Sequence, residues 1–182
     1  MELRYLGQGL QRFYRVRPET EGDVSAIREV NRLAFGRQNE SRLIEAIRAS
    51  EFFVPELSLV ALSDEVIGHI LFSILSIETE NGTVPTLGLA PMAVKPEYQN
   101  QGVGTTLVRE GLEKCAELGF GHVVVLGHPN FYPKFGFVTA KSKEIQPPFP
   151  VRNDVFMVYE IQTGSLEGIR GKVKYPPAFD AV

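Results

Sequence analysis

A short glycine-containing segment offers the clearest chemistry in the sequence. Gly102-Val103-Gly104 stands where a predicted strand has ended and a strongly periodic helix begins. Such a turn presents backbone N–H groups without partners inside the helix, and the helix dipole adds partial positive charge to them. Glycines let a ligand approach the main chain without meeting a side chain. The segment is therefore suited to a pyrophosphate, although a flexible strand-to-helix turn would use the same residues.

Two common phosphate-binding motifs do not fit this segment. A dinucleotide fingerprint would need a third glycine at position 107, which is Leu107. A P-loop would end in Gly-Lys-Ser/Thr, whereas Gly104 is followed by Thr105 and Thr106. The tripeptide alone leaves the identity of the anion open.

Two longer motifs around this turn resemble a known family. Met92 to Tyr98 followed by Gln99 to Gly104 (MAVKPEY-QNQGVG) resembles the acetyl-CoA motif Gln/Arg-x-x-Gly-x-Gly/Ala of the GNAT acetyltransferases. Asn130 to Phe137 (NFYPKFGF) resembles the family's FY-x-x-x-GF segment, in the same order and spacing. The resemblance runs from about Val16 to Ile161, and it is closest to the YhbS-type group of predicted bacterial acetyltransferases.

This resemblance implies an N-acetyltransferase that moves an acetyl group from acetyl-CoA to a primary amine by direct attack in a ternary complex. Acetyl-CoA is the implied cosubstrate, no metal is implied, and the acceptor would be a small molecule or a peptide. The implied cofactor-binding residues are Met92, Ala93, Val94, Gln99, Asn100, Gln101, Gly102, Val103, Gly104, Thr105, Asn130 and Tyr132.

Within that set, the resemblance gives particular roles to a few residues. The Met92 N–H would stabilise the tetrahedral oxyanion, and Val94 would pair with the pantetheine arm. Tyr132 would act as the general acid that protonates the departing thiolate, because a phenol stays protonated at neutral pH. As alternatives, Tyr132 could be a packing aromatic and Asn130 a turn-forming residue.

Pro91 lies inside the predicted strand Thr86–Val94. Proline cannot donate a hydrogen bond to a sheet, so it predicts a bulge or a break at this point. In the family that the chain resembles, the matching strand bulges and splays from the strand after the glycine-turn helix. The resemblance therefore places a gap for pantetheine between Thr86–Val94 and His122–Leu126.

The general base is the weak point of the enzyme hypothesis. Many family members carry a glutamate at the position that matches Gly88, which has no side chain. Glu40, Glu78 and His128 are candidates, and a base could also act through water. The sequence alone favours the alternative that Glu40 is an exposed helix charge and that His128 is a loop histidine with satisfied hydrogen bonds. The missing carboxylate keeps open a non-catalytic CoA-binding or regulatory module, and another acyl donor or a hydroxyl acceptor also remain alternatives.

The composition limits the number of domains and the kinds of partner that the chain can have. The 182 residues fit one domain, with 43% hydrophobic and 23% charged residues. The net charge of −3, without a basic run, gives no sign of a nucleic-acid or membrane partner. Cys115 is the single cysteine and is predicted to be core, and no Cys/His cluster has metal-ligand spacing. The N-terminus does not resemble a signal peptide, so a cytoplasmic location is expected.

The elements that must position these residues follow from hydrophobic periodicity and turn residues. Helices are predicted over Asp23–Ala34, Glu40–Ala49 and Val103–Leu118, with a short helical turn over Asn130–Phe135. Strands are predicted over Arg12–Arg17, Leu57–Leu62, Val66–Ile77, Thr86–Val94, His122–Leu126, Gly136–Thr139 and Val155–Ile161. The expected fold class is α/β (α+β): a mixed, mostly antiparallel twisted sheet flanked by helices, with a central strand splay.

The domain is predicted to span residues 1–162, followed by a C-terminal tail extension over 163–182. That tail contains glycines and a Pro-Pro pair, and no regular structure is predicted for it. It could cover the acceptor pocket or contribute to a homodimer.

Overall fold

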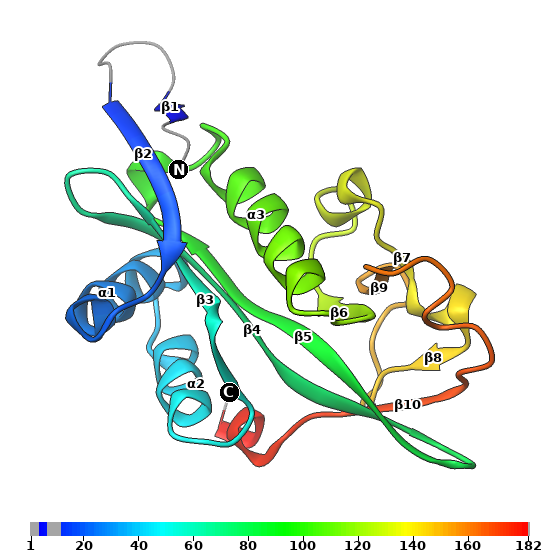
Figure 1. Ribbon diagram of the computed structural model, residues 1–182. Helices are drawn as coiled ribbons and strands as arrows, with labels where there is room; N and C mark the ends of the chain where they lie inside the picture. Colours follow the sequence, from blue (N-terminus) through cyan, green and yellow to red (C-terminus); the bar gives the residue numbers. More distant parts are fainter. Residues whose placement is uncertain (1–3, 7–11, 182) are drawn as a thin grey trace.

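The computed structural model describes residues 4–6 and 12–181 (Figure 1). The strands are β1 Arg4–Leu6, β2 Arg12–Pro18, β3 Phe53–Leu62, β4 Val66–Thr79, β5 Gly82–Val94, β6 His122–Leu126, β7 Val138–Thr139, β8 Ile145–Gln146, β9 Phe156–Glu160 and β10 Gly171–Lys174. The α-helices are α1 Val24–Phe35, α2 Asn39–Arg48 and α3 Val103–Glu117. Short 3₁₀ helices are η1 Glu21–Asp23, η2 Pro96–Tyr98, η3 Tyr132–Phe135, η4 Ala140–Lys143 and η5 Pro177–Ala181.

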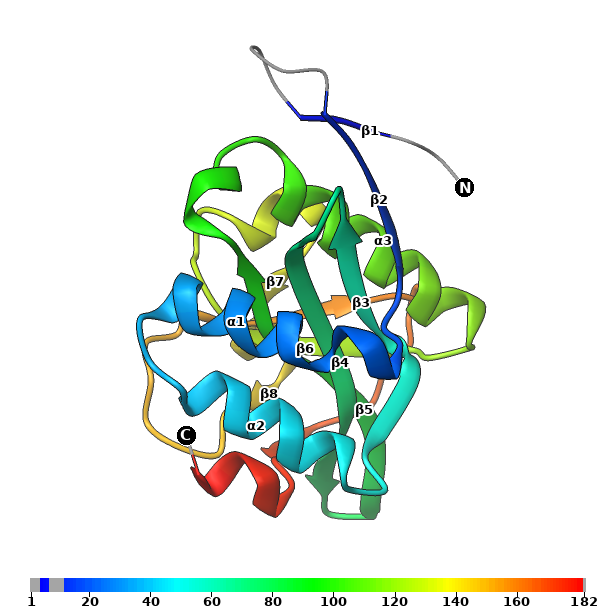
Figure 2. The ribbon, with the colours of Figure 1, turned by 90° about the vertical axis from the view of Figure 1, so that its left-hand side faces the viewer.

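The strands form one sheet in the order β1-β2-β3-β4-β5-β6-β9-β7, and β10 pairs with both β4 and β8. Neighbours along that order are antiparallel except β5 and β6, which are parallel and are connected through α3. Helices α1 and α2 cover one face of the sheet and α3 covers the other (Figures 1 and 2). This arrangement confirms the predicted fold class. Within the described residues, no helix combines the length and the apolar character needed to cross a membrane.

Helix α3 joins the sheet through a stripe of apolar side chains. Val103, Leu107, Val108 and Cys115 are all buried against the sheet, as their helical spacing predicts. Burial raises the pKa of the Cys115 thiol to about 12, which fits the predicted role of Cys115 as a core residue. On the same helix Gly111 leaves room for the ring of Phe72 on β4, because a Cβ at position 111 would lie 2.4 Å from the Phe72 ring atom Cε2.

We expect Gly111→Ala to destabilise the fold by about 1–2 kcal/mol. Alanine favours a helix over glycine by about 1 kcal/mol, but overpacking a core costs about 1–3 kcal/mol. Phe72 is fully buried, so its ring cannot swing into solvent to relieve the contact. Urea unfolding measures the change. Gly22→Ala is the control, since its Cβ would meet only Thr20 Oγ1 at 3.7 Å. A Gly111→Ala protein as stable as the wild type would contradict this packing.

Strand β5 bulges at Pro91, as predicted. Phe72 pairs with Leu89 and Ile70 pairs with Met92, so β5 contains one more residue than β4 over this stretch. The parallel pairing of β5 with β6 ends at Leu89, opposite Val125. Beyond that point residues 92–94 of β5 pair with β4, and no residue of β5 after Leu89 pairs with β6, so the predicted splay between the two strands is confirmed.

The prediction that the C-terminal tail has no regular structure is wrong. Strand β10 pairs with the distal half of β4, where Val173 lies opposite Ile77 and is buried. Helix η5 then packs next to α2 (Figure 2). Four residues with one buried side chain leave almost no periodic signal in the sequence. The partner for β10 is an edge almost a hundred residues earlier in the chain.

Candidate cofactor-binding and catalytic site

The leading end of α3 has a row of available amides. Asn100 and Gly102 have positive φ angles of 59° and 88°, which reverse the chain just before the helix. The first backbone bond of the helix runs from the Thr106 N–H to the Gly102 carbonyl at 3.0 Å. In the described part of the chain, the N–H groups of residues 100–105 have no backbone partner, and no side chain caps the helix. These amides and the helix dipole form a site for an anion.

Gln99 holds this turn in place. Its N–H donates to the Pro96 carbonyl at 3.3 Å, and its side-chain Nε2 donates to the Val94 carbonyl at 3.0 Å. The side chain therefore ties the turn to the end of β5. The available amides begin after Gln99, at Asn100.

The amide row adjoins the open stretch of β5. A Cβ at Gly104 would lie 3.4 Å from both Sδ and Cε of Met92, so the Met92 side chain reaches the first turn of α3. Met92 itself follows the bulge, in the stretch of β5 that has no partner on the β6 side. The sequence motif thus brings two features side by side: a row of unpaired amides and an unpaired strand edge.

Tyr132 begins η3, close to the end of β6. Its ring lies across Gly127, where a Cβ would come within 2.3 Å of the tyrosine ring atom Cε2, and it packs edge-on against Phe131 and Phe137. The side chain is only 6% exposed, and this burial raises the pKa of Tyr132 to about 12. Among the described residues the phenol oxygen has no hydrogen-bond partner. A protonated hydroxyl on a largely buried ring, without a partner among the described residues, is available to a ligand.

The same segment holds a residue that the sequence analysis did not single out. Lys134 Nζ donates to Thr105 Oγ1 at 3.1 Å and lies 4.1 Å from the centre of the Phe131 ring. This contact joins η3 to the first turn of α3 and adds a positive charge beside the amide row. The sequence did offer a way to find this residue, because Lys134 is the lysine of the NFYPKFGF motif. Asn130 is exposed at the start of the segment.

The candidate bases lie in different places. Glu40 is 6% exposed, so the alternative that it is an exposed helix charge is wrong; its carboxylate pairs with Arg37. Glu78 lies near the distal end of β4 and pairs with Lys174 at 3.0 Å. His128 is exposed just before η3, and its carbonyl accepts hydrogen bonds from residues 131 and 132. The structure therefore does not gather these three residues at one place.

Gly88 is enclosed by its neighbours. A Cβ at this position would lie 2.4 Å from Cδ1 of Leu75, which is itself buried. Gly88 pairs with Ser73, whose buried hydroxyl has no partner in the described structure. A carboxylate side chain would have to displace Leu75 to fit here. The packing around position 88 therefore has no room for the glutamate that many family members have.

A second polar cluster is buried beneath α1 and α2. His69 Nε2 lies 2.9 Å from Ser58 Oγ, Ser58 Oγ donates to Glu19, and Arg48 Nε donates to Glu19 at 2.7 Å. Burial lowers the pKa of His69. Burial alone would raise the pKa of Glu19, but its hydrogen-bonded neighbours outweigh it and lower that pKa to about 2. Ser58 is fully buried, so the Ser-His-Glu set cannot reach a substrate as a nucleophile.

The comparisons with known proteins agree with this geometry. Residues 24–137 match the model of the acetyltransferase (GNAT) family. The chain is 34% identical over 167 residues to YhbS of Escherichia coli K12, an uncharacterized N-acetyltransferase, which covers 91% of this chain and 98% of YhbS.

Two solved structures also match most of the chain. A crystal structure of E. coli YhbS in complex with CoA aligns with a TM-score of 0.84 and 31% identity, covering 97% of this chain and 96% of that one. A GNAT family acetyltransferase from Brucella melitensis, in complex with acetyl-CoA, aligns with a TM-score of 0.75 and 31% identity, covering 92% of this chain and 98% of that one.

Proposed function

Because the chain belongs to the acetyltransferase (GNAT) family, we propose that it transfers the acetyl group of acetyl-CoA to a primary amine. In this proposal the amine attacks the thioester directly while both substrates are bound. The acceptor is a small molecule or a peptide. Acceleration comes largely from holding the two reactants in line, which can lower a barrier by about 7–11 kcal/mol.

The observation that carries the proposal is the junction of the amide row with the open edge of β5. Amides of residues 100–105 would hold the pyrophosphate of CoA, and the unpaired stretch containing Met92 and Val94 would receive the amides of pantetheine. The pantetheine arm would then lead the thioester into the gap between β5 and β6. The two relatives with solved complexes, one with CoA and one with acetyl-CoA, support this cosubstrate.

Two groups would carry the chemistry. The Met92 N–H would donate to the oxyanion that forms when the amine attacks the acetyl carbon. As that intermediate collapses, the carbon–sulfur bond breaks and the sulfur leaves as a thiolate. Tyr132 would give its phenolic proton to this thiolate, the attacking nitrogen would lose a proton to water, and water would return a proton to Tyr132, so the products are the acetylated amine and free CoA. Asn130, exposed at the start of the same segment, would add a polar contact to the cofactor.

Titration calorimetry with CoA and with acetyl-CoA tests the first half of this proposal. We expect both ligands to bind, and we expect release of free thiol from acetyl-CoA when a suitable amine is present. No heat of binding from either ligand at millimolar concentration would contradict the proposed function. Binding without thiol release across a broad panel of amines would instead favour a non-catalytic CoA-binding module. This is the second candidate function, because Gly88 lacks the carboxylate that many family members have at this position.

A further inference from the structure

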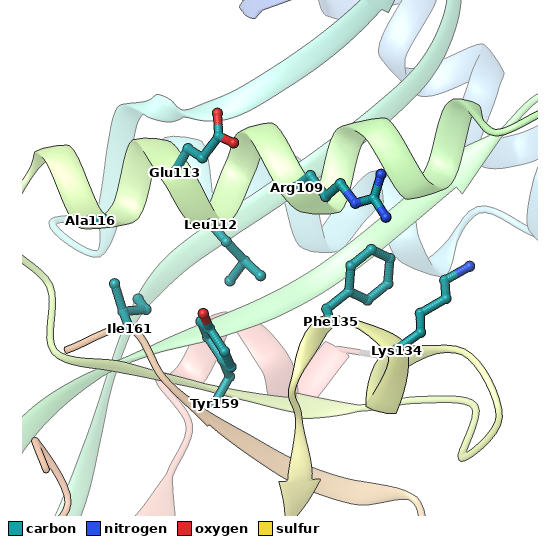
Figure 3. A pocket seen from close by; sticks show the side chains of 8 residues that line it. All are labelled: Arg109, Leu112, Glu113, Ala116, Lys134, Phe135, Tyr159 and Ile161. Atoms are coloured by element: carbon teal, nitrogen blue, oxygen red, sulfur yellow. The ribbon is translucent and has the colours of Figure 1, made fainter. Parts of the chain in front are cut away.

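The two faces of the sheet differ in charge next to the gap between β5 and β6. On the α3 face, a groove of about 340 Å³ is lined in part by the charged side chains of Arg109, Glu113 and Lys134. Figure 3 shows the ends of Arg109 and Lys134 beside the ring of Phe135. Helix α3, with its amide row, lies on this face (Figure 1). A cosubstrate bound there leaves the opposite face of the gap for the acceptor.

On the opposite face, apolar side chains surround position 88. Leu75 of β4 lies over Gly88, and Val124 of β6 pairs with Gly88. Both side chains are buried in one apolar cluster to which α3 contributes no residue. Polar side chains on this face, Thr86 and His122, lie farther from the gap and form a hydrogen bond with each other at 2.7 Å. The surface next to the gap is therefore apolar and uncharged.

Leu126 extends this apolar surface to the open end of the gap. Side chains two residues apart along a strand point to the same face, so Leu126 shares the face of Val124. It pairs with Phe156, which is buried in the same cluster. Leu126 itself is 45% exposed, and it lies one residue beyond the last β6 residue that pairs with β5. A large apolar side chain exposed at this point is available to a ligand in the gap.

The loop between β8 and β9 borders the same end of β6. Val155, the last residue of this loop, accepts a hydrogen bond from the Gly127 N–H at 2.9 Å. The loop carries an aromatic ring in Phe149, which is 44% exposed. Its two charged residues, Arg152 and Asp154, form an ion pair with each other. The loop therefore adds apolar surface and no unpaired charge to the acceptor side.

This apolar face has a chemical consequence for the acceptor. A primary aliphatic amine is mostly an ammonium ion at neutral pH, and only the neutral form can attack the thioester. Apolar surroundings disfavour the ammonium form and so favour the reactive one. A second charged group on the acceptor would lose water at this surface without gaining a partner, because position 88 has no carboxylate.

We propose that the acceptor is a primary amine on an uncharged alkyl or aralkyl chain, and that this chain lies against Leu126 and the apolar face behind it. This inference rests on the proposed function and narrows the acceptor of the same reaction, in which the amine nitrogen gains the acetyl group and CoA leaves as the free thiol. Amines with a second cation or a carboxylate near the reacting nitrogen are poor acceptors.

Thiol release from acetyl-CoA with matched amines tests this assignment. Butylamine and putrescine differ by one ammonium group, and phenethylamine and phenylalanine differ by one carboxylate. We expect kcat/KM to be at least about tenfold higher for the member of each pair without the extra charge, because that charge would be desolvated without a partner. Hexylamine should exceed butylamine about fourfold, since each half-buried methylene contributes about twofold.

Variants at Leu126 test the position of the chain. Leu126→Asp places a carboxylate at the open end of the gap, so it should shift the ratio of kcat/KM about fivefold towards putrescine over butylamine. Leu126→Asn, of the same size and neutral, should reduce the preference for hexylamine without favouring putrescine. Leu118→Asp is the control, because Leu118 is 43% exposed at the far end of α3 and its replacement should leave both ratios unchanged.

The results distinguish the inference from the proposed function. If the charged member of either pair reacts as well as its partner, or if no uncharged amine releases thiol while acetyl-CoA binds, the assignment of the acceptor is wrong. An unchanged amine preference in Leu126→Asp also overturns it. The proposed function fails separately, when calorimetry shows binding of neither CoA nor acetyl-CoA. Thermal unfolding verifies that the variants are folded, which we expect because Leu126 is exposed.

Discussion

Replacing Tyr132 with phenylalanine should lower the turnover number by about 10²- to 10³-fold and change CoA affinity by less than about threefold. General acid catalysis typically contributes about 10²- to 10⁴-fold, and this change removes only the acidic hydroxyl. The ring keeps its contacts with Gly127, Phe131 and Phe137. Since the hydroxyl has no partner among the described residues, its removal leaves no buried group unsatisfied, and stability should be unchanged.

The acidity of the buried phenol is suited to a buried thiolate. Burial raises the pKa of Tyr132 to about 12, which is well above the ordinary pKa of a thiol in water. Against a thiolate in water, the phenol would therefore be a poor proton donor. The same effect raises the pKa of the buried Cys115 thiol to about 12. A CoA sulfur held in a similarly apolar place would become more basic in the same way, so proton transfer from Tyr132 would stay close to balanced.

The pH dependence follows from the same shift. An acid catalyst loses activity as pH rises through its pKa, because the proton it must donate has gone. With a pKa of about 12, Tyr132 keeps its proton well above neutral pH. Deprotonation of Tyr132 should therefore cause no loss of turnover below about pH 10.

Free-thiol release and CoA calorimetry measure the two effects of Tyr132→Phe separately. Tyr175→Phe is a matched control, because burial raises the pKa of Tyr175 to about 12 as well, within a different aromatic cluster with Phe149 and Phe179. Tyr175→Phe should retain turnover. A Tyr132→Phe enzyme that keeps more than a third of wild-type turnover would show that the thiolate leaves without this proton. If Tyr132→Phe lost CoA binding, the role of Tyr132 would be to pack the site and not to donate a proton.

The elements that position the site were predictable because their signals are local. Helix α3 shows a stripe of apolar residues over four turns, and the glycine turn sets its start at Val103, where the structure also begins it. The continuous apolar run of β6 predicts burial on both faces, and the observed strand has the predicted bounds. Pro91 predicted the bulge from a property of proline itself, which holds in any sequence context.

Features that depend on distant partners were not predictable in the same way. Strand β10 exists because β4 extends far enough to offer it an edge, and neither segment alone indicates this. Glu40 is a polar residue on an amphipathic helix, and only the packing of α1 and α2 shows that its side chain is buried beside Arg37. Lys134 is an ordinary surface cation in the sequence. Its contact with Thr105 on α3 requires the fold.

The empty position at Gly88 shows how the two kinds of information combine. The sequence reveals that a carboxylate is missing relative to the family pattern. The structure adds that Leu75 fills the space such a side chain would enter. Leu75 is a diagonal neighbour of Gly88 across the β4–β5 hairpin, where Gly88 pairs with Ser73 and Leu75 with Thr86, so the packing of this sheet excludes a larger side chain at position 88. A side chain restored at position 88 alone would therefore clash before it could act as a base.

Thr105→Asp should weaken CoA binding by about 10²-fold while leaving the protein as stable as the wild type or slightly more stable. Thr105 is the third residue of α3, where a carboxylate interacts favourably with the helix dipole and gains about 0.3–1 kcal/mol. The same carboxylate would lie within the proposed pyrophosphate site. Two like charges about 5 Å apart repel by about 3 kcal/mol at an effective dielectric of 20, which corresponds to about 10²-fold in affinity.

The opposite signs of these two effects make the experiment decisive for the anion site. A protein that loses CoA affinity because it is damaged also loses stability, whereas charge repulsion at a helix terminus does not reduce it. Thr105→Asn, equal in size to aspartate but neutral, is the control and should bind CoA within about threefold of the wild type. Because Lys134 already donates to Thr105, the new carboxylate would also recruit that cation away from the ligand.

Calorimetry at two salt concentrations completes the test. Repulsion between partly exposed charges is screened, so the difference in affinity between Thr105→Asp and Thr105→Asn should narrow as ionic strength rises from about 0.01 M to 0.15 M, over which the screening length falls from about 30 Å to 8 Å. A Thr105→Asp protein that binds CoA as tightly as the asparagine variant at low salt would place the phosphates away from the first turn of α3. The proposed path of the pantetheine arm along β5 would then be contradicted too, because that path is inferred from the position of the pyrophosphate.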